Sequence, residues 1–329
     1  MAQVQTLRGP VDSAALGRVL IHEHIFLMDM EYTYNYRPDF FAEQTIADAA
    51  ARLNALKASG IDTIIDLTVL GLGRHVPSLA KVAPLTDLNI VISTGAYTFD
   101  EVPGPFAFHG PGLLLDRPEP MVDLFVRDIT EGVAGTGIRA GQLKCAIDMQ
   151  GLRPGVERIM RAVARANVLT GCPITVHTAP QAETGLVVQQ VLAEEGVNLE
   201  DVIIGHCGDT GDTDYLMKLA DRGSLLGMDR FGVEFAITME QRVATIAEMV
   251  KRGYAGQMAL SHDCCAWSDF FPQVTDYHRA MPRHHYLHIH DDVIPALREA
   301  GVGQRDLDTM FVDNPRRHFE NAARHFAQR

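Results

Sequence analysis

Eight short apolar runs, separated by longer amphipathic stretches, set the main constraint on how this chain folds. Each run is rich in Val, Ile and Leu and has the length of one buried strand. Apolar strands that alternate with helices indicate a parallel sheet whose faces are covered by helices. The runs occupy residues 18–22, 62–68, 89–95, 138–145, 173–178, 201–206, 223–229 and 257–263.

The stretches between these runs carry apolar residues three and four apart, which predicts helices. Four of them end in a glycine, as helices commonly do: 45–60, 156–171, 183–196 and 239–253. Eight strand–helix units within 329 residues indicate a (β/α)₈ TIM barrel, with residues 1–329 forming a single domain. A doubly wound sheet is the rival fold, but it needs a Gly-rich phosphate loop where this sequence reads HEHIFLMD.

Charge and composition exclude some classes of binding partner for this protein. The formal net charge is −13, which argues against nucleic acid or an anionic membrane surface as partner. Five cysteines without regular spacing form no disulfide framework and suit a reducing compartment. The sequence shows neither a secretory signal nor an apolar stretch of membrane-spanning length. We therefore expect a cytoplasmic protein whose partner is a small molecule.

Polar side chains gather where the predicted strands end. The first run ends in His22 and His24, which point to the same side because strand residues alternate in direction. Barrel enzymes build their sites at the C-terminal ends of the strands, so side chains at those ends should meet at one mouth. The other polar strand ends are Lys144, His177, His206 and Asp263.

This set of side chains favours a metal site. A lone histidine at a strand end is more often a hydrogen-bonded core residue, but four imidazoles at one mouth are costly to bury without a shared partner. Neutral imidazoles with a carboxylate suit Zn²⁺ first, with Co²⁺, Mn²⁺ or Fe²⁺ as alternatives. The set exceeds what one tetrahedral ion needs, so we expect two divalent ions joined by a bridging anion. A carbamylated Lys144 could bridge them, although chemistry alone favours a lysine that forms a salt bridge or anchors substrate.

Several segments together resemble the phosphotriesterase family of the amidohydrolase superfamily, and within it the phosphotriesterase-like lactonases. The likeness extends from residue 8 to residue 319, and its motifs fall in the family's order. They are LIHEH (20–24), GQLKCA (141–146), PITVHT (173–178), VIIGHCGDT (202–210) and SHD (261–263).

The resemblance implies a division of the metal ligands. His22, His24 and Asp263 correspond to the ligands of one metal ion. His177 and His206 correspond to those of the other. A carbamylated Lys144 bridges the two ions in this family, and Asp263 takes the proton of the attacking water and passes it to the leaving group.

Residues near the strand ends suggest what the site accepts. Tyr97 matches a tyrosine that lies over the metals in the lactonase branch, although a half-buried position at the rim explains it equally well. The segment GMDRFG (227–232) also resembles the lactonases, which makes Arg230 and Phe231 candidate substrate contacts, with a structural role for Arg230 as the alternative. Phe99 departs from the family, whose lactonases often carry a second tyrosine there, so the acyl-length preference stays open.

A long loop is expected over residues 264–292, after the eighth run. Its Trp267, Phe270 and Phe271 could form an apolar wall over the mouth for an acyl chain, or could simply pack the loop. The same segment contains four histidines that look like a metal tract, for which we expect a solvated loop or helix start instead. They are His284, His285, His288 and His290.

The leading functional hypothesis is a binuclear metal hydrolase that opens lactones. N-acyl-homoserine lactones, the signals removed in quorum quenching, are the expected substrates, with slower hydrolysis of phosphotriesters. A dedicated organophosphate or aryl-ester hydrolase is the alternative. A non-catalytic ligand-binding barrel is disfavoured, because buried metal ligands are costly to keep without use. We also expect a homodimer.

Overall fold

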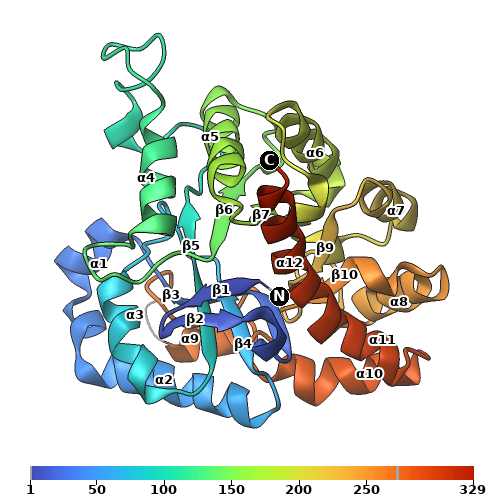
Figure 1. The fold of residues 1–329 in the computed structure, drawn as a ribbon. Coiled ribbons are helices and arrows are strands. Elements are labelled where there is room, and N and C mark those ends of the chain that lie inside the picture. The colour runs from blue at the N-terminus through green and yellow to red at the C-terminus, as the bar shows by residue number, and fades with distance from the viewer. Residues whose placement is uncertain (1, 272–273) are drawn as a thin grey trace.

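The computed structural model describes residues 2–271 and 274–329. Its nine-stranded sheet is parallel throughout, and helices surround it on the outside (Figure 1). Starting from β11 at one edge, the strands follow one another in chain order from β3 to β10. The strands are β3 (Val19–Leu27), β4 (Thr63–Asp66), β5 (Asn89–Gly95), β6 (Gln142–Ala146), β7 (Ile174–His177), β8 (Val202–Ile204), β9 (Leu225–Met228), β10 (Met258–Leu260) and β11 (Cys265–Ser268).

The end of the sheet returns to its beginning and closes a barrel. Strand β11 pairs in parallel with β3, so that Cys265 lies opposite His24. The connection from β10 also bonds to β3, since the Asp263 N–H donates to the His22 carbonyl at 3.0 Å and the His24 N–H donates to the Cys264 carbonyl at 2.8 Å. Strands β10 and β11 thus share one place in the circle, and the predicted (β/α)₈ barrel is confirmed.

The helices include the four that the sequence predicted, which correspond to α2, α5, α6 and α8. Within the described residues, no helix is both long enough and apolar enough to cross a membrane. Residues 264–292 contain β11, α9 and the beginning of a π-helical turn at Ile289–Val293. The helices are α1 (Met30–Tyr36), α2 (Glu43–Ala58), α3 (Val76–Val82), α4 (Pro120–Thr130), α5 (Pro154–Thr170), α6 (Thr184–Glu194), α7 (Thr213–Asp221), α8 (Met239–Lys251), α9 (Val274–Ala280), α10 (Ile294–Glu299), α11 (Gln304–Asp308) and α12 (Asn314–Ala327).

Alternating strand residues feed two apolar cores. Leu20 points outward to the core between strands and helices, whereas its neighbours Val19 and Ile21 point into the barrel. The register of β3 against β4 shifts between Leu20 and Glu23, and beyond this irregularity His22 and His24 face the barrel mouth. The N-terminal hairpin of β1 (Gln3–Thr6) and β2 (Gly9–Asp12) adds Val4 to the inner core, and α12 adds Phe319. This apolar packing fills the interior below the C-terminal strand ends, where the polar side chains predicted to form the site are found.

Gly95 lies where β5 passes the backbone of β6. A Cβ atom at this position would lie 1.8 Å from the Lys144 carbonyl oxygen, and the glycine has a φ of +138°. Any other residue would therefore push β6 away, together with the Lys144 side chain at the mouth. Gly256 offers a contrast, because a Cβ atom there would meet no atom within 4 Å.

We predict that Gly95→Ala lowers the free energy of unfolding by about 3 kcal/mol, because the added methyl group overpacks a closed strand pair. Gly256→Ala is the matched control and should change it by less than about 1 kcal/mol. Urea unfolding followed by circular dichroism measures both. Equal midpoints for the two variants would show that β5 and β6 can separate without cost.

Candidate metal centre

Three of the predicted side chains meet at one point of the barrel mouth. Asp263 Oδ1 lies 3.3 Å from His22 Nε2 and 3.0 Å from His24 Nε2. Two atoms that bind one tetrahedral Zn²⁺ at about 2.0–2.1 Å lie roughly 3.3 Å apart, so this group has the spacing of a shared ligand set. The Lys144 Nζ lies 3.4 Å from His22 Nε2 on the neighbouring side.

The other two histidines face each other next to this group. His177 Nδ1 lies 2.7 Å from His206 Nε2, and the Tyr97 hydroxyl lies 3.5 Å from the same His177 nitrogen. The rings of His22 and His206 stack with centroids 5.1 Å apart, which joins the two halves of the cluster. The structure therefore brings together all six side chains that the sequence placed at the mouth, with Tyr97 at their edge.

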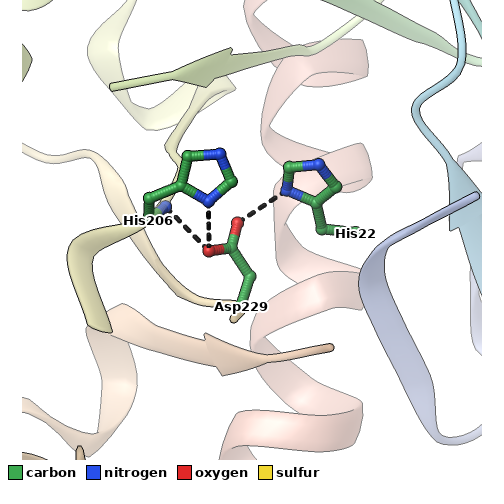
Figure 2. A group of neighbouring side chains, drawn as sticks. All are labelled: His22, His206 and Asp229. Carbon is green, nitrogen blue, oxygen red and sulfur yellow. Dashed lines mark hydrogen bonds and ion pairs between the residues drawn. The ribbon is translucent and has the colours of Figure 1, made fainter. Parts of the chain in front are cut away.

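A buried carboxylate behind the cluster, Asp229, holds two of the histidines (Figure 2). His22 Nδ1 donates to its Oδ2 at 2.7 Å, and both His206 Nδ1 and the His206 backbone N–H donate to its Oδ1, at 3.0 and 2.7 Å. Burial raises the pKa of Asp229, but the two imidazoles outweigh burial and hold the pKa well below its usual range. Although these three residues lie close enough together to hold a metal, the bonds at Nδ1 make Asp229 a support that leaves both Nε2 atoms free.

The remaining histidines also have a partner on the ring nitrogen that faces away from the cluster. His24 Nδ1 lies 2.8 Å from the Thr68 hydroxyl, and His177 Nε2 lies 3.2 Å from Asp148 Oδ2. The bond to His177 lowers the pKa of Asp148 to about 2, against the raising effect of its burial. Each imidazole is thus held at one nitrogen and presents the other to the cluster.

These tautomers create a need for a cation between His177 and His206. Each of the two rings gives its proton to a carboxylate, so two nitrogen lone pairs confront each other over 2.7 Å. Protonation is a poor remedy, because burial lowers the pKa of His177 to about 4 and that of His206 well below the usual range. A divalent metal ion satisfies both lone pairs at once, and the donor set suits one.

Burial also shifts the pKa values of the two charged side chains in the cluster, Lys144 and Asp263. It lowers the pKa of Lys144 to about 8, despite the nearby Asp263 and Asp229. Burial raises the pKa of Asp263, but His22, His24 and His206 overcome this effect and hold it well below its usual range. Asp263 therefore remains a carboxylate at neutral pH, while a part of Lys144 is a neutral amine.

Two of the candidate ligands sit on unusual backbone. His206 has a φ of +64° and Asp263 a φ of +59°, in the left-handed region that residues other than glycine rarely adopt. Glu23, which lies between His22 and His24 in the sequence, stabilises the second of these turns. Its carboxylate accepts from the Ser261 hydroxyl, from the backbone and Nδ1 of His262, and from the Cys264 N–H, at 2.7 to 3.0 Å.

Arg230 links the cluster to the next layer of polar residues. Its guanidinium donates to Asp263 Oδ2 at 3.2 Å and to Asp209 Oδ2 at 2.9 Å. The wholly buried Arg242 donates to the other oxygen of Asp209. Arg230 therefore orients the most exposed member of the cluster, whose side chain is 17% exposed.

The aromatic residues predicted to contact the substrate differ in how deeply they are buried. Phe231 is wholly buried in the outer core, so it cannot touch a substrate in this conformation. Trp267 packs against Phe40 and under the Arg37 guanidinium, and Phe271 packs against Tyr277. Only Phe270 is strongly exposed among the three aromatic residues expected to form a wall. Phe99, by contrast, lies beside Tyr97 and His177, with ring centroids 4.9 and 5.2 Å apart.

The histidine-rich tract is more buried than expected. The expectation of a solvated segment is wrong for His284, which donates from Nε2 to the His262 carbonyl and contacts the Tyr277 hydroxyl through Nδ1. His288 is also buried, at 0% exposed, and bonds to Asp292, but it stands at the start of the turn Ile289–Val293, as the helix-start alternative predicted. Their different partners explain why the tract forms no metal site among the described residues.

Four supporting residues were not predicted from the sequence: Thr68, Asp148 and Asp229, which bond to the histidines, and Asp209, which bonds to Arg230. Asp229 ends the seventh predicted strand, so the rule that selected the other strand ends should have selected it too. Asp148 follows β6 and Thr68 follows β4, at the same edge of the barrel. A search for acceptors beside each candidate ligand would have found all of them in the connections after strands.

Comparison with known proteins agrees with this geometry. The profile of the phosphotriesterase family matches residues 2–319. A phosphotriesterase homology protein of Mycobacterium tuberculosis is 53% identical over 97% of this chain and 98% of its own, and an aryldialkylphosphatase of Saccharolobus solfataricus is 34% identical over 94% and 96%. The solved structure of the phosphotriesterase from Mycobacterium tuberculosis superposes with a TM-score of 0.94 at 54% identity, covering 97% of this chain and 98% of that one. The chain therefore belongs to the phosphotriesterase family of metal-dependent hydrolases.

Proposed function

We propose that this protein hydrolyses lactones, with N-acyl-homoserine lactones as its main substrates and phosphotriesters as slower ones. The proposal includes two divalent metal ions, Zn²⁺ in the first place, held by His22, His24 and Asp263 on one side and by His177 and His206 on the other. The single observation that carries it is the Tyr97 hydroxyl, a hydrogen-bond donor that lies against the candidate ligands.

Tyr97 suits an ester that has no activated leaving group. Burial, aided by Asp263, raises the pKa of its phenol, so the hydroxyl keeps its proton and can donate to a substrate oxygen. A lactone develops charge on its carbonyl oxygen and on a poor alkoxide leaving group, and both gain from a fixed donor. An aryl phosphotriester has a better leaving group and should depend on this donor less.

The other residues have supporting roles in the proposed reaction. The metal ions would supply a water of lowered pKa and polarise the substrate oxygen. Asp263, kept ionised by its surroundings, is the base that accepts the water proton and returns it to the leaving alkoxide. Arg230 holds Asp263 in place by its bond to Oδ2 and is itself anchored by Asp209.

A carbamate on Lys144 would complete the ligand set. The reaction with CO₂ requires a neutral amine, and the lowered pKa of about 8 leaves a part of Lys144 in that form near neutral pH. The Nζ lies 3.4 Å from His22 Nε2, so a carboxylate built on it would lie among the imidazoles. A plain ammonium would repel two cations, whereas a carbamate neutralises part of their charge.

The alternative function is a dedicated phosphotriesterase. The names of the relatives favour it, since the relative from Saccharolobus solfataricus is an aryldialkylphosphatase. The same charged residues would serve either substrate, because both reactions need a water nucleophile and a polarised oxygen. Tyr97 is where the two functions should differ.

We predict that Tyr97→Phe lowers kcat/KM for an N-acyl-homoserine lactone by about 10²–10³, the cost of losing one donor to the developing oxyanion. The value for an aryl phosphotriester such as paraoxon should fall less, because its leaving group needs less help. Steady-state kinetics on both substrates measures the difference. Tyr254→Phe removes a surface hydroxyl bonded to Asp221 and serves as the control.

The kcat/KM values of the wild-type protein for lactones and phosphotriesters decide between the lactonase and the phosphotriesterase function. A higher kcat/KM for the phosphotriester than for every lactone tested would contradict the proposed function and establish the alternative. An equal fall for both substrates in Tyr97→Phe would mean that the hydroxyl supports the site as a whole.

We predict that Lys144→Ala loses most of its metal content and activity, because the bridging carboxylate can no longer form. Added acetate or propionate should restore part of both, since a small carboxylate fits the space that the side chain leaves. Metal analysis after gel filtration and activity assays with each acid test this. Lys218→Ala, on the exposed face of α7, is the control. Full metal content in Lys144→Ala would show that the lysine is not a ligand.

We predict that Asp229→Asn weakens metal binding by about 10–100-fold, the usual cost of losing a residue that orients metal ligands. His22 and His206 donate to different oxygens of Asp229, and an amide replaces one of these acceptors with an NH₂ donor. Competition with a chelator measures the affinity. Asp214→Asn is the control, since its side chain is 79% exposed. Unchanged affinity in Asp229→Asn would mean that the histidines need no orienting carboxylate.

A further inference from the structure

A cavity lies outside the barrel wall, away from the C-terminal ends of the strands. Its volume is about 240 Å³, and it opens between the loop after α2, at Ser59–Ile61, and the helices α10 and α11. These two helices lie beside each other at the lower right of the fold (Figure 1). The apolar part of the cavity is lined by Leu20, Ile61, Ile289, Ile294 and Leu307.

Two guanidinium groups line the same cavity, those of Arg18 and Arg298. Arg18 forms an ion pair with Asp308 at 3.6 Å, and its guanidinium lies over the Phe311 ring. Arg298 bonds to the neutral amide of Gln304. Burial lowers the pKa of Arg18, and the charge of Arg298 adds to this effect against Asp308 and Asp62. An anion bound beside both guanidiniums would offset the repulsion between them.

The inner wall of the cavity is also the outer wall of the metal centre. His262, which lines the cavity, precedes Asp263 in the chain and donates to Glu23 at 2.7 Å. Its other nitrogen accepts from the Ile289 N–H at 3.0 Å, and Ile289 lines the cavity as well. Tyr286, a further lining residue, donates its hydroxyl to the His24 carbonyl. Two lining residues therefore bond directly to the segments that carry His24 and Asp263.

We propose that this cavity binds an amphipathic carboxylate with a short alkyl chain and that its occupancy alters the metal centre. The carboxylate lies between the guanidiniums of Arg18 and Arg298, and the chain covers the apolar residues below them. Binding acts through His262 and Tyr286, because these side chains contact the ligand on one side and the strand of the metal ligands on the other. This second part rests on the proposed metal function, whereas the binding itself does not.

The combination of charge and apolar surface selects this ligand class. A phosphate or other small oxyanion would leave the apolar lining exposed to water, and a hydrocarbon would make no polar contact with the guanidiniums. A cationic amphiphile would meet two like charges. The product of a lactonase is itself an amphipathic hydroxy acid, so the proposed reaction supplies a molecule of the class that the cavity selects.

Octanoate is the probe, and isothermal titration calorimetry on the metal-loaded enzyme gives its affinity. Arg298→Gln should weaken octanoate binding at least tenfold, and Ile294→Trp should abolish it by filling the cavity. Arg305→Gln is the matched control, because Arg305 is exposed on α11 and does not line the cavity. Octylamine should bind at least tenfold more weakly than octanoate to the wild type.

The effect on the metal centre is read from kinetics and from the rate of metal loss to a chelator. Octanoate should change kcat, or the rate of metal loss, at least twofold in the wild type and in Arg305→Gln but not in Arg298→Gln. Purely competitive inhibition that survives in Arg298→Gln would place octanoate in the active site alone and overturn the inference, as would binding without an effect on either rate. A protein that holds no metal would refute the proposed function instead, and octanoate titration of that protein still tests the cavity.

Discussion

The buried carboxylate of Asp229 is the constraint on which the arrangement of the site depends. It accepts hydrogen bonds from His22 in β3 and from His206, which follows β8, and it fixes the tautomer of both. A carboxylate that is 0% exposed is costly to bury unless it is fully bonded, so the two imidazoles stabilise it as much as it orients them. This mutual dependence leaves the Nε2 lone pairs facing inward, where a cation can satisfy them.

The closure of the barrel likewise orients a candidate metal ligand, Asp263. The chain leaves β10, turns through a residue with positive φ and continues as β11, so that the backbone of Asp263 and Cys264 bonds to β3. Such a turn costs about 1–3 kcal/mol when the residue is not glycine. The four hydrogen bonds accepted by Glu23 offset this cost and hold the turn in one conformation. Glu23 therefore explains the HEH sequence, in which two imidazoles face the mouth and the glutamate faces the wall behind it.

The same part of the barrel wall lies between the metal centre and the cavity beside α10. Tyr286 and His262 lie between the metal centre and the cavity beside α10, and each bonds to a segment that carries candidate ligands. The inner apolar core at the N-terminal end of the barrel is built instead from residues such as Val4 and Phe319. The fold thus separates a side that provides stability from a side where polar groups interact, as barrels of this type do.

The sequence by itself determined the barrel and the inner ring of the site, because both follow from local rules. Apolar runs of strand length fixed the strands, and the alternation of strand residues turned His22 and His24 to one side, with His177, His206, Lys144 and Asp263 at the same edge. Only the tertiary structure decided what stands behind these residues. Asp229 reaches His22 across 207 positions of sequence, and Tyr286 reaches His24 across 262. The burial of His284 and His288, and the packing of Trp267 against Phe40, depend likewise on which segments the closed barrel brings into contact. Periodicity predicts the direction of a side chain relative to its own strand, whereas its partner is set by the packing of distant strands and loops.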